Sequence, residues 1–524
     1  MRVMNMTKAI SKTQLFLAIV LTALLLAPAV FAAAPGITGP NFNLTARAEY
    51  VTQPDGSAIY SWGYGCVGTP AFAPSAITNA FCTNMQVPGP TLIVTQGQTV
   101  TVNLTNNLPV AAGNTSILFP GFNVTSSTGA GTQRGLLTQE AIPGGTVSYT
   151  FTATTPGTRA YYSGTQGDLQ MEMGLYGAII VLPSTIPTEC TSGIHTSNAA
   201  AQANWGESNF RLAAAAYNHP GACYDREYLF QFSEIDPRIH TEALKQSTRT
   251  CTGCMTVATE PYVPAYFMIN GRSMPDDMDP NYAPQFPHQP YNGNPHMHPG
   301  ELVLLRIIGQ GRWQHPFHEH GNHVRVLARD GNLILSTTSP TDPNLAGPLL
   351  FTTTTTPGLA IDGIYYWTGR GLNWDPYGHN PASADPMAKL PCTPDANGYN
   401  TGNPTAINYF EWCQDHNKPL QTTPTGDVAG GGPATLPDPN IFANGPWYGG
   451  SPYLGPNATV RAVGSTGTTP PSGTVANSPT DEAGFAFMWH SHNEREITTN
   501  NIFPGGMLMM MLVDSREFVI NESN

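Results

Sequence analysis

The chain has 524 residues, of which only 11% are charged, and its formal net charge is −13 at pH 7. This acidic balance excludes a basic surface for nucleic acid, and a chain of this length has room for more than one domain. Its 53 glycines and 48 prolines make it rich in turns, which favours β-structure over long helices.

The first 33 residues have the pattern of a secretory signal peptide. Arg2 and Lys8 precede a mostly apolar stretch over residues 15–30, and small residues follow near Ala32. An uncleaved anchor is the alternative, but the apolar stretch is short for a bilayer, and no later segment is long enough to span one. We therefore predict a signal peptide at 1–33, no membrane span in the mature chain, and export to the periplasm or the extracellular space.

The eight cysteines fit an exported chain, because an even number in an oxidising compartment indicates disulfides. Cys251 and Cys254 form a Cys-x-x-Cys motif, which also occurs in redox and zinc sites. No second such motif completes a zinc site, so a small structural loop is favoured. Other pairings stay open, but pairing neighbours along the chain gives Cys66–Cys82, Cys190–Cys223, Cys251–Cys254 and Cys392–Cys413.

Alternating apolar and polar residues predict β-strands in the first third of the chain. Pro, Gly and Asn separate these runs, as in β-sandwiches, where short strands follow one another through tight turns. The predicted strands cover 41–53, 85–94, 97–109, 146–151 and 174–181.

A segment rich in Thr, Ser, Ala and Asn at 186–222 is interpreted as a linker to a second set of strands. Residues 370–480 are rich in Gly, Pro, Asn and Thr, and they are too many for a plain loop. We interpret them as an insertion in the second domain, closed by Cys392–Cys413. The strands predicted around the insertion cover 227–232, 266–272, 300–308, 322–327, 356–367 and 485–492.

Two histidine motifs mark the candidate site. The two His-x-His pairs are His318 with His320 and His490 with His492, and His315 precedes the first pair. Alternate residues of a strand point to the same face, so each pair can direct two imidazoles at one ion or at two adjacent ions. Imidazole suits copper, zinc, iron and nickel. The sequence therefore predicts a transition-metal site.

Several of these strands and turns resemble the multicopper oxidase family, which includes laccases. The resemblance rests on the Val87–Thr91 opening, the Thr105–Pro109 strand ending, the Gly174–Ala178 closing strand and the Asn270–Gly271 turn. It implies an all-β fold of tandem cupredoxin-like Greek-key β-sandwiches. The implied boundaries are domain 1 at 40–185, the linker at 186–222, and domain 2 at 223–515 with the irregular insertion at about 370–480.

In that family the first domain supplies two His-x-His pairs to a three-copper cluster. This chain has no histidine between Met1 and Cys190, and the corresponding positions hold Leu118, Pro120, Tyr162 and Gly164. Four ligands implied by the resemblance are therefore absent, and four-electron reduction of dioxygen by the family's mechanism is not expected.

The family also holds a blue copper through a thiolate, two histidines and often an axial methionine. By resemblance, His315 belongs to that site and Met507 lies near the axial position. Ser491 stands at the thiolate position, and Glu496 stands at the second histidine position. A neutral serine is a poor copper ligand, so a normal blue copper site is not expected.

The resemblance assigns the remaining motif histidines to the cluster side, where four imidazoles would suit one copper, zinc or nickel ion or a rearranged binuclear centre. Glu494 and Glu496 are candidates to add oxygen ligands or to orient a histidine. A relic that packs and hydrogen-bonds without metal is the alternative. The predicted metal ligands are His315, His318, His320, His490 and His492, with Glu494, Glu496 and Met507 as further candidates.

The other histidines and the Met-rich run have plainer interpretations. His296 and His298 either extend the metal site or lie in a solvated turn. The run at 507–512 is interpreted as a closing core strand rather than as a Cu(I) site. Ordinary roles are expected for His195, His219, His240, His379 and His416.

Three functions stay open. The first is an exported copper-dependent oxidoreductase with an altered site, acting on a metal ion or a small reductant. The second is metal binding without turnover, and the third is a metal-free cupredoxin scaffold that binds a protein partner. The retained histidines favour the first two. Two-domain relatives often assemble as trimers, so a homotrimer is an expectation from resemblance.

Overall fold

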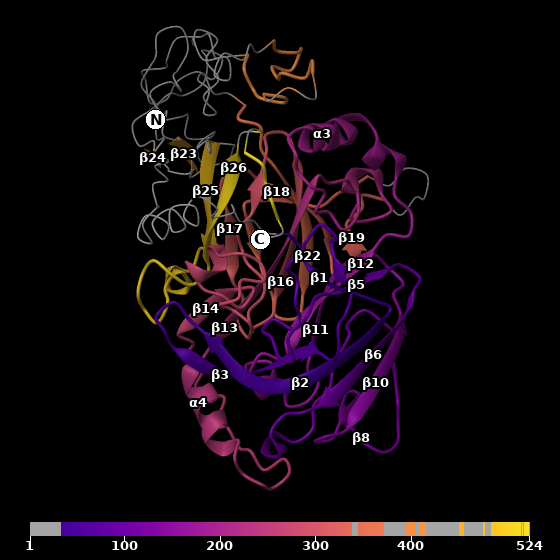
Figure 1. Ribbon diagram of the computed structural model, residues 1–524, viewed down its shortest axis with the longest axis vertical. Helices are drawn as coiled ribbons and strands as arrows, with labels where there is room; N and C mark the ends of the chain where they lie inside the picture. The colour runs from indigo at the N-terminus through magenta and orange to yellow at the C-terminus, as the bar shows by residue number, and fades with distance from the viewer. Residues whose placement is uncertain are drawn as a thin grey trace, which may run out of the picture.

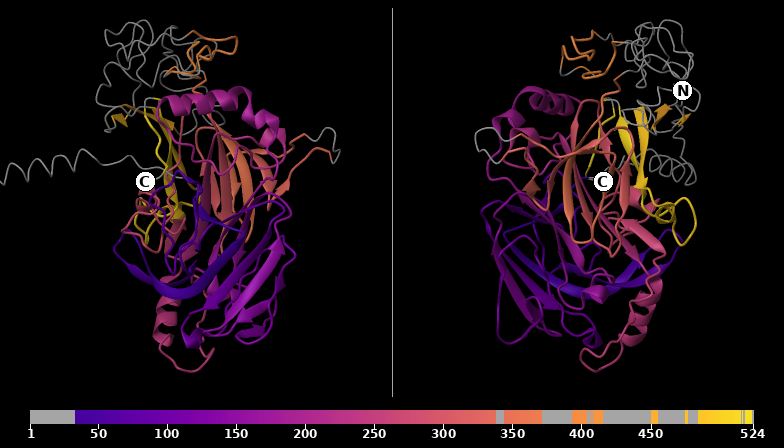
Figure 2. Two further views of the ribbon diagram at one scale, coloured as in Figure 1. Left: turned by 45° about the vertical axis from the view of Figure 1, so that its right-hand side comes forward. Right: turned by 180° about the vertical axis from the view of Figure 1, so that it is seen from behind.

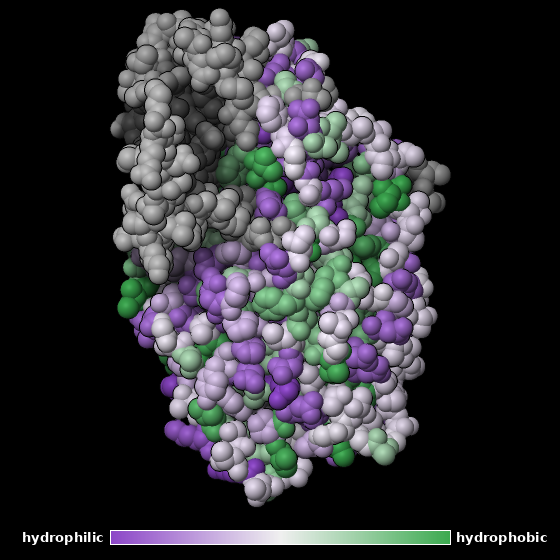
Figure 3. Space-filling view, in the orientation of Figure 1, coloured by the Kyte–Doolittle hydropathy of each residue, from purple (hydrophilic) through white to green (hydrophobic). Residues whose placement is uncertain are grey.

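The computed structural model describes residues 33–337, 344–370, 393–403, 408–414, 484–514 and 518–522, with short pieces at 406, 450–454, 475–476 and 516. Strands dominate these residues and form two β-sandwiches, so the predicted all-β fold is confirmed. Figure 1 shows the indigo and violet strands of the first sandwich in the lower half and the later strands above them. On the face shown in Figure 3, hydrophilic and hydrophobic residues are interspersed over both sandwiches.

The first sandwich consists of two five-stranded sheets, in the orders β11-β12-β5-β1-β4 and β3-β2-β6-β10-β7. Strand β6 shows the sequence pattern behind it, because Val100, Val102 and Leu104 are buried and alternate with partly exposed polar residues. A separate pair, β8 and β9, forms a small hairpin. The strands are β1 (Gly36–Thr38), β2 (Asn41–Thr52), β3 (Ala58–Cys66), β4 (Phe72–Ala73), β5 (Leu92–Thr95), β6 (Thr99–Asn106), β7 (Thr125–Ser126), β8 (Thr132–Arg134), β9 (Gln139–Ala141), β10 (Thr146–Thr152), β11 (Gly157–Tyr162) and β12 (Tyr176–Leu182).

The second sandwich consists of a sheet in the order β14-β13-β16-β22-β18-β19, with β20 beside β18, and a sheet in the order β15-β26-β25-β17-β21. In the latter, β23 pairs with β25 and β24 pairs with β23. Buried aromatic residues such as Phe317, Phe487 and Trp489 fill its core. The strands are β13 (Arg226–Ile235), β14 (Tyr266–Ile269), β15 (His296–Met297), β16 (Leu302–Gly309), β17 (Pro316–Glu319), β18 (Val324–Arg329), β19 (Asn332–Leu333), β20 (Leu349–Leu350), β21 (Thr352–Thr354), β22 (Ala360–Tyr366), β23 (Gly450–Leu454), β24 (Val475–Ala476), β25 (Gly484–Ser491) and β26 (Leu508–Asp514).

Helices occupy places where the sequence analysis expected none. The segment interpreted as a linker contains α3 (Gly193–Asn204), which lies across one end of the second sandwich (Figure 2). Helix α4 (Pro237–Gln246) begins at the N-cap Asp236 and buries Ile239 and Ala243 in the core of the first sandwich. The second half of the chain therefore completes the first core. A short helix, α2 (Gly167–Gln170), precedes β12.

The sequence analysis also did not predict β3 and β11. Strand β3 is buried at every position from Ile59 to Cys66, so it lacks the alternation that marks a half-exposed strand. Strand β11 is likewise buried along most of its length. Strand β17, on which the first His-x-His pair was expected, ends at Glu319, so His320 lies just beyond it.

The disulfides Cys66–Cys82, Cys190–Cys223 and Cys251–Cys254 are present as predicted. Cys413 is also disulfide-bonded, whereas Cys392 lies outside the described residues. The predicted signal peptide at 1–33, apart from Ala33, and most of the insertion at 370–480 lie outside them as well. Among the helices that the structure describes, none has both the length and the hydropathy that crossing a membrane requires.

Candidate metal centre

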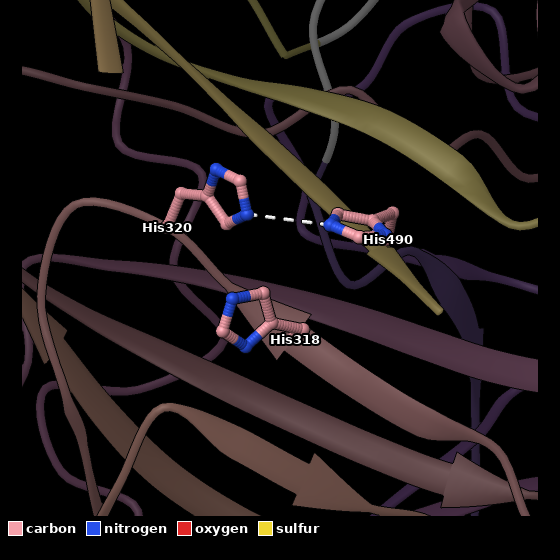
Figure 4. A group of neighbouring side chains, drawn as sticks. All are labelled: His318, His320 and His490. Carbon is pink, nitrogen blue, oxygen red and sulfur yellow. Dashed lines mark hydrogen bonds between the residues drawn. The ribbon is translucent and has the colours of Figure 1, made fainter. Parts of the chain in front are cut away.

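The candidate centre lies where β17 and β25 run antiparallel. His318 of β17 and His490 of β25 are opposite each other in the register, so the pairing itself brings the two imidazoles together. His320 follows the end of β17, and its ring centroid is 4.8 Å from that of His318 and 5.2 Å from that of His490. Figure 4 shows the three rings converging from the two strands.

The spacing of the ring nitrogens fits one metal ion. One nitrogen from each of His318, His320 and His490 lies within 4.8 Å of the other two. The Nε2 atoms of His320 and His490 are 3.3 Å apart, as the dashed line in Figure 4 marks. Histidine nitrogens bind a metal at about 2.0–2.1 Å, so two of them on one ion lie at most about 4.2 Å apart. Small side-chain shifts would therefore place all three around a single ion.

Hydrogen bonds orient the rings of this cluster. His318 Nδ1 lies 2.9 Å from Thr352 Oγ1 of β21, and His490 Nδ1 donates to the carbonyl of Ser491 at 2.7 Å. The bond at Nδ1 leaves the Nε2 of His490 facing His320. Fixing one ring nitrogen so that the other is presented to a metal is the usual way in which proteins orient histidine ligands.

The protonation state of the cluster also suits a metal. Burial lowers the pKa of His318 to about 4, and the neighbouring imidazoles His320 and His490 lower it further in the same direction. Burial likewise lowers the pKa of His490. His318 and His490 are therefore neutral at pH 7, and a neutral imidazole keeps the lone pair that a metal requires.

His492 lies at the exposed rim of the same cluster. Its ring centroid is 4.9 Å from that of His318 and 5.5 Å from that of His490. Its backbone N–H donates to the carbonyl of Pro316 at 2.8 Å, which ties the end of β25 to the start of β17. The structure thus gathers the four histidines that the resemblance assigned to the cluster side.

His315 lies apart from the cluster, in the interior of the sandwich. Its Nδ1 is 2.9 Å from Glu496 Oε2, and its Nε2 is 2.9 Å from Glu234 Oε2. All three side chains are fully buried. A carboxylate only accepts hydrogen bonds, so both ring nitrogens of His315 must carry a proton.

The pKa of His315 agrees with this geometry. Burial alone lowers the pKa, but the hydrogen bonds and negative charges of Glu234 and Glu496 outweigh it and raise the pKa from 6.5 to about 9. His315 is therefore a buried imidazolium at pH 7. In this state neither ring nitrogen offers a lone pair to a metal.

The residues around His315 do not form a blue copper site. The Oγ of Ser491 donates to Glu496 Oε2, and the N–H of Ser491 donates to the carbonyl of Met507 at 3.0 Å. Met507 belongs to the hydrophobic core, and Glu494 is exposed on a short 3-10 turn. With no thiolate and with the imidazole protonated, the donor set does not fit a blue copper ion.

The first-domain positions that resemblance pairs with the family's histidines do lie side by side. Leu118 and Tyr162 form a β-bridge, in which the N–H of Leu118 donates to the carbonyl of Tyr162 at 2.7 Å. A Cβ added to Gly164 would lie 2.8 Å from the Cγ of Leu118. The space is filled by carbon, so these positions offer no imidazole to a metal.

A second group with metal-like spacing is a salt-bridge network. Nitrogen and oxygen atoms of Glu207, His298 and Glu301 lie within 4.8 Å of one another. Arg226 already fills that position, at 2.6 Å from Glu207 and 2.5 Å from Glu301. Arg516 adds a second cation at 3.9 Å from Glu301, so two arginines balance the two carboxylates without a metal.

Ion pairs and hydrogen bonds show the roles of the histidines outside the two motifs. His298 pairs with Glu207, and His296 pairs with Asp514 at 2.6 Å, so neither lies in a solvated turn. The expected ordinary roles hold for three histidines within the described residues. His195 pairs with Asp225, His219 caps a 3-10 turn, and His240 contacts the carbonyl of Tyr60. His379 and His416 lie outside the described residues.

Three residues of the site were not found from the sequence. Thr352 of β21 is brought to His318 by the register of the sheet. Glu234 of β13 is brought to His315 because the two sheets face each other. Glu319, between His318 and His320, points into the core, where burial raises its pKa to about 8. The sequence shows a glutamate inside the His-x-His motif, but it does not show that this glutamate is buried.

Comparison with known proteins agrees with the fold and with the motifs. Residues 68–185 and residues 258–361 each match a family model described as multicopper oxidase. These two matches support a multicopper-oxidase-like protein of the cupredoxin superfamily. The matched segments lie one in each sandwich, and the second contains His315, His318 and His320.

The individual relatives and solved structures that the chain resembles are distant from it. A stretch of 98 residues is 38% identical to an L-ascorbate oxidase from Brassica rapa subsp. pekinensis, and it spans 19% of this chain and 16% of that relative. A solved multicopper oxidase is 14% identical, over 90% of this chain and 86% of its own, with a TM-score of 0.44. A blue copper oxidase from Nitrosomonas europaea is 15% identical, over 90% and 85%, with a TM-score of 0.43.

Proposed function

We propose that this chain is an exported, copper-binding oxidoreductase with a single altered metal centre. His318, His320 and His490 would hold the ion, and His492 would close the site from its exposed rim. The observation that carries the proposal is the approach of three ring nitrogens to within 4.8 Å. Three disulfides and the predicted signal peptide at 1–33 support export, because disulfides persist in oxidising compartments.

The chain's own residues would prepare the centre for this role. A copper ion held by imidazoles supplies one-electron redox chemistry. Thr352 and the carbonyl of Ser491 orient the rings, and burial keeps His318 and His490 neutral. Phe351 is 41% exposed and packs against both His318 and His323, so it offers a small reductant an apolar face beside the cluster. A metal ion is the alternative substrate.

Metal analysis of the mature chain after copper loading and removal of excess ion tests the centre. We expect about one ion per chain in the wild type and loss of that ion in a His318→Ala, His490→Ala double variant. His219→Ala is the matched control, because His219 caps a remote turn. A wild type without bound metal would contradict the proposal and favour a metal-free scaffold that binds a protein partner.

Metal binding without turnover is the second candidate. The absence of a thiolate at Ser491 and of first-domain histidines favours it, because both belong to the electron path that resemblance implies. Oxygen uptake with phenols, Cu(I), Fe(II) or Mn(II) separates the two. Uptake that exceeds that of the double variant supports the oxidoreductase, and equal rates support the binder. A homotrimer stays a prediction, which sedimentation of the mature chain tests.

A further inference from the structure

Four separate segments meet at the corner of the second sandwich behind the histidine cluster. His315 comes just before β17, Ser491 ends β25, Glu234 lies in β13, and Glu496 lies in the 3-10 turn Glu494–Ile497. By resemblance, three of these four positions belong to the blue copper site. In this chain the same segments are joined by hydrogen bonds between buried side chains.

Other groups donate further hydrogen bonds to both carboxylates, Glu234 and Glu496. Glu234 Oε1 accepts from the N–H of Arg312 at 2.6 Å and from the N–H of Trp313 at 2.9 Å. Tyr262 adds its hydroxyl to the same oxygen at 3.2 Å. On the other carboxylate, Glu496 Oε1 accepts from the side-chain amide of Asn493 at 2.9 Å. Buried carboxylates need such complete pairing, because an unsatisfied buried charge is strongly destabilising.

This pairing requires His315 to keep both protons. A metal ion at His315 would have to displace one of them, and it would then leave a carboxylate without its partner. The corner therefore holds its four segments together without metal. The two hydrogen bonds of the His315 imidazolium join segments that, by resemblance, a metal ion would join in the family's site.

We propose that Glu234, His315, Glu496 and Ser491 form a metal-free tie that positions the end of β25, and with it the cluster histidines His490 and His492. The tie itself stands on the geometry of this corner alone. Its positioning role rests on the metal centre proposed above.

The route from the tie to the cluster runs through Ser491. Its hydroxyl is held by Glu496, its carbonyl accepts from His490 Nδ1 at 2.7 Å, and its chain neighbours are His490 and His492. A small rotation of Ser491 would therefore move both imidazoles. A metal site tolerates displacements of only about 0.5 Å in its ligands. Glu496 and Ser491 are thus positioning residues, because they act on the centre through the histidines.

A Glu496→Gln variant of the mature chain tests the tie. The matched control is Glu189→Gln, the same change at an exposed glutamate far from this corner. In the presence of EDTA, we expect Glu496→Gln to lower the midpoint of denaturant unfolding and Glu189→Gln to leave it unchanged. Ser491→Ala, which removes only the hydroxyl, provides a milder second variant and is expected to lower the midpoint less.

A separate measurement tests whether Glu496 positions the cluster histidines. Cobalt(II) added to the stripped, folded protein reports ligand geometry through its visible spectrum. We expect Glu496→Gln to change that spectrum and to weaken cobalt binding by roughly 10–100-fold, the usual cost of losing a partner that orients a ligand. An unchanged spectrum and affinity would overturn the positioning role, even if the midpoint falls.

A further variant separates this proposal from the proposed metal centre. The His318→Ala, His490→Ala double variant should bind no copper at the tie. Copper that this variant retains and that Glu496→Gln then removes would overturn the metal-free assignment. If the wild type binds no metal at all, the proposed metal centre fails, while the midpoint of Glu496→Gln still decides whether the tie exists.

Discussion

His315 and His318 are three residues apart, yet the structure gives them opposite chemical states. His315 lies fully buried between two carboxylates, which raise its pKa to about 9. His318 lies among other imidazoles, and burial together with their charges lowers its pKa to about 4. At pH 7 the first is a cation that donates two hydrogen bonds, and the second is a neutral ring with a lone pair.

The difference shows that a histidine motif does not set the role of its members. The role of each histidine is set by its spatial partners, most of which come from distant segments of the chain. Glu234 and Glu496 turn His315 into part of a salt-bridged triad, whereas His320 and His490 turn His318 into part of a candidate metal centre. One short segment therefore has a structural side and a metal-binding side.

Removing the imidazole of His315 should produce the largest loss of stability. A His315→Leu variant leaves Glu234 and Glu496 buried without their cation, and breaking a buried ion pair costs about 3–5 kcal/mol. We expect that loss in the free energy of unfolding, measured with urea in the presence of EDTA. His492→Leu is the control on the cluster side, and we expect it to stay within about 0.5 kcal/mol of the wild type because His492 is exposed. Equal losses for the two variants would contradict the comparison.

Raising the pH should weaken the same triad by a smaller amount. The folded pKa of His315, about 9, exceeds its ordinary value of 6.5, so its stabilising contribution is complete below pH 6.5. The contribution is lost as the pH rises through about 9, since the triad then loses its cation. Glu234 and Glu496 face the ring, and Tyr262 and Arg312 face Glu234.

Urea unfolding of wild type and His315→Leu between pH 6 and pH 10, both in EDTA, measures this dependence. The difference between the two proteins should shrink as the pH rises. A difference that stays constant over this range would show that His315 does not carry the proton that its two partners require.

A change beside His318 should affect the metal centre with little effect on the fold. Thr352→Val removes the hydroxyl at His318 Nδ1, and we expect copper affinity to fall by roughly 10–100-fold because the ring loses its orienting partner. Thr354→Val, at an exposed position of the same strand, is the matched control. Competition with a chromogenic chelator measures both affinities. Equal affinities would remove Thr352 from the site.

The sequence predicted those strands whose residues alternate between apolar and polar along the chain. Strands such as β6 alternate between core and solvent, so their period of two is visible in the residues. Strand β3 is buried on both faces and shows no alternation. Helix α4 gains its place by packing Ile239 and Ala243 into the first sandwich, which is a contact between distant parts of the chain. Local patterns do not encode such a contact.

For the site, resemblance to the family marked Ser491 as the thiolate position. The sequence alone determined the two His-x-His motifs and the lack of histidines before Cys190. It did so because these features follow from residue identity and from spacing along one strand. The tertiary structure decided that His318 and His490 face each other and that His315 lies between Glu234 and Glu496. The protonation of an imidazole depends on the charges around it in space. Here those charges come from the facing sheet, through Glu234, and from the turn after β25, through Glu496, both of which are far from His315 in the chain.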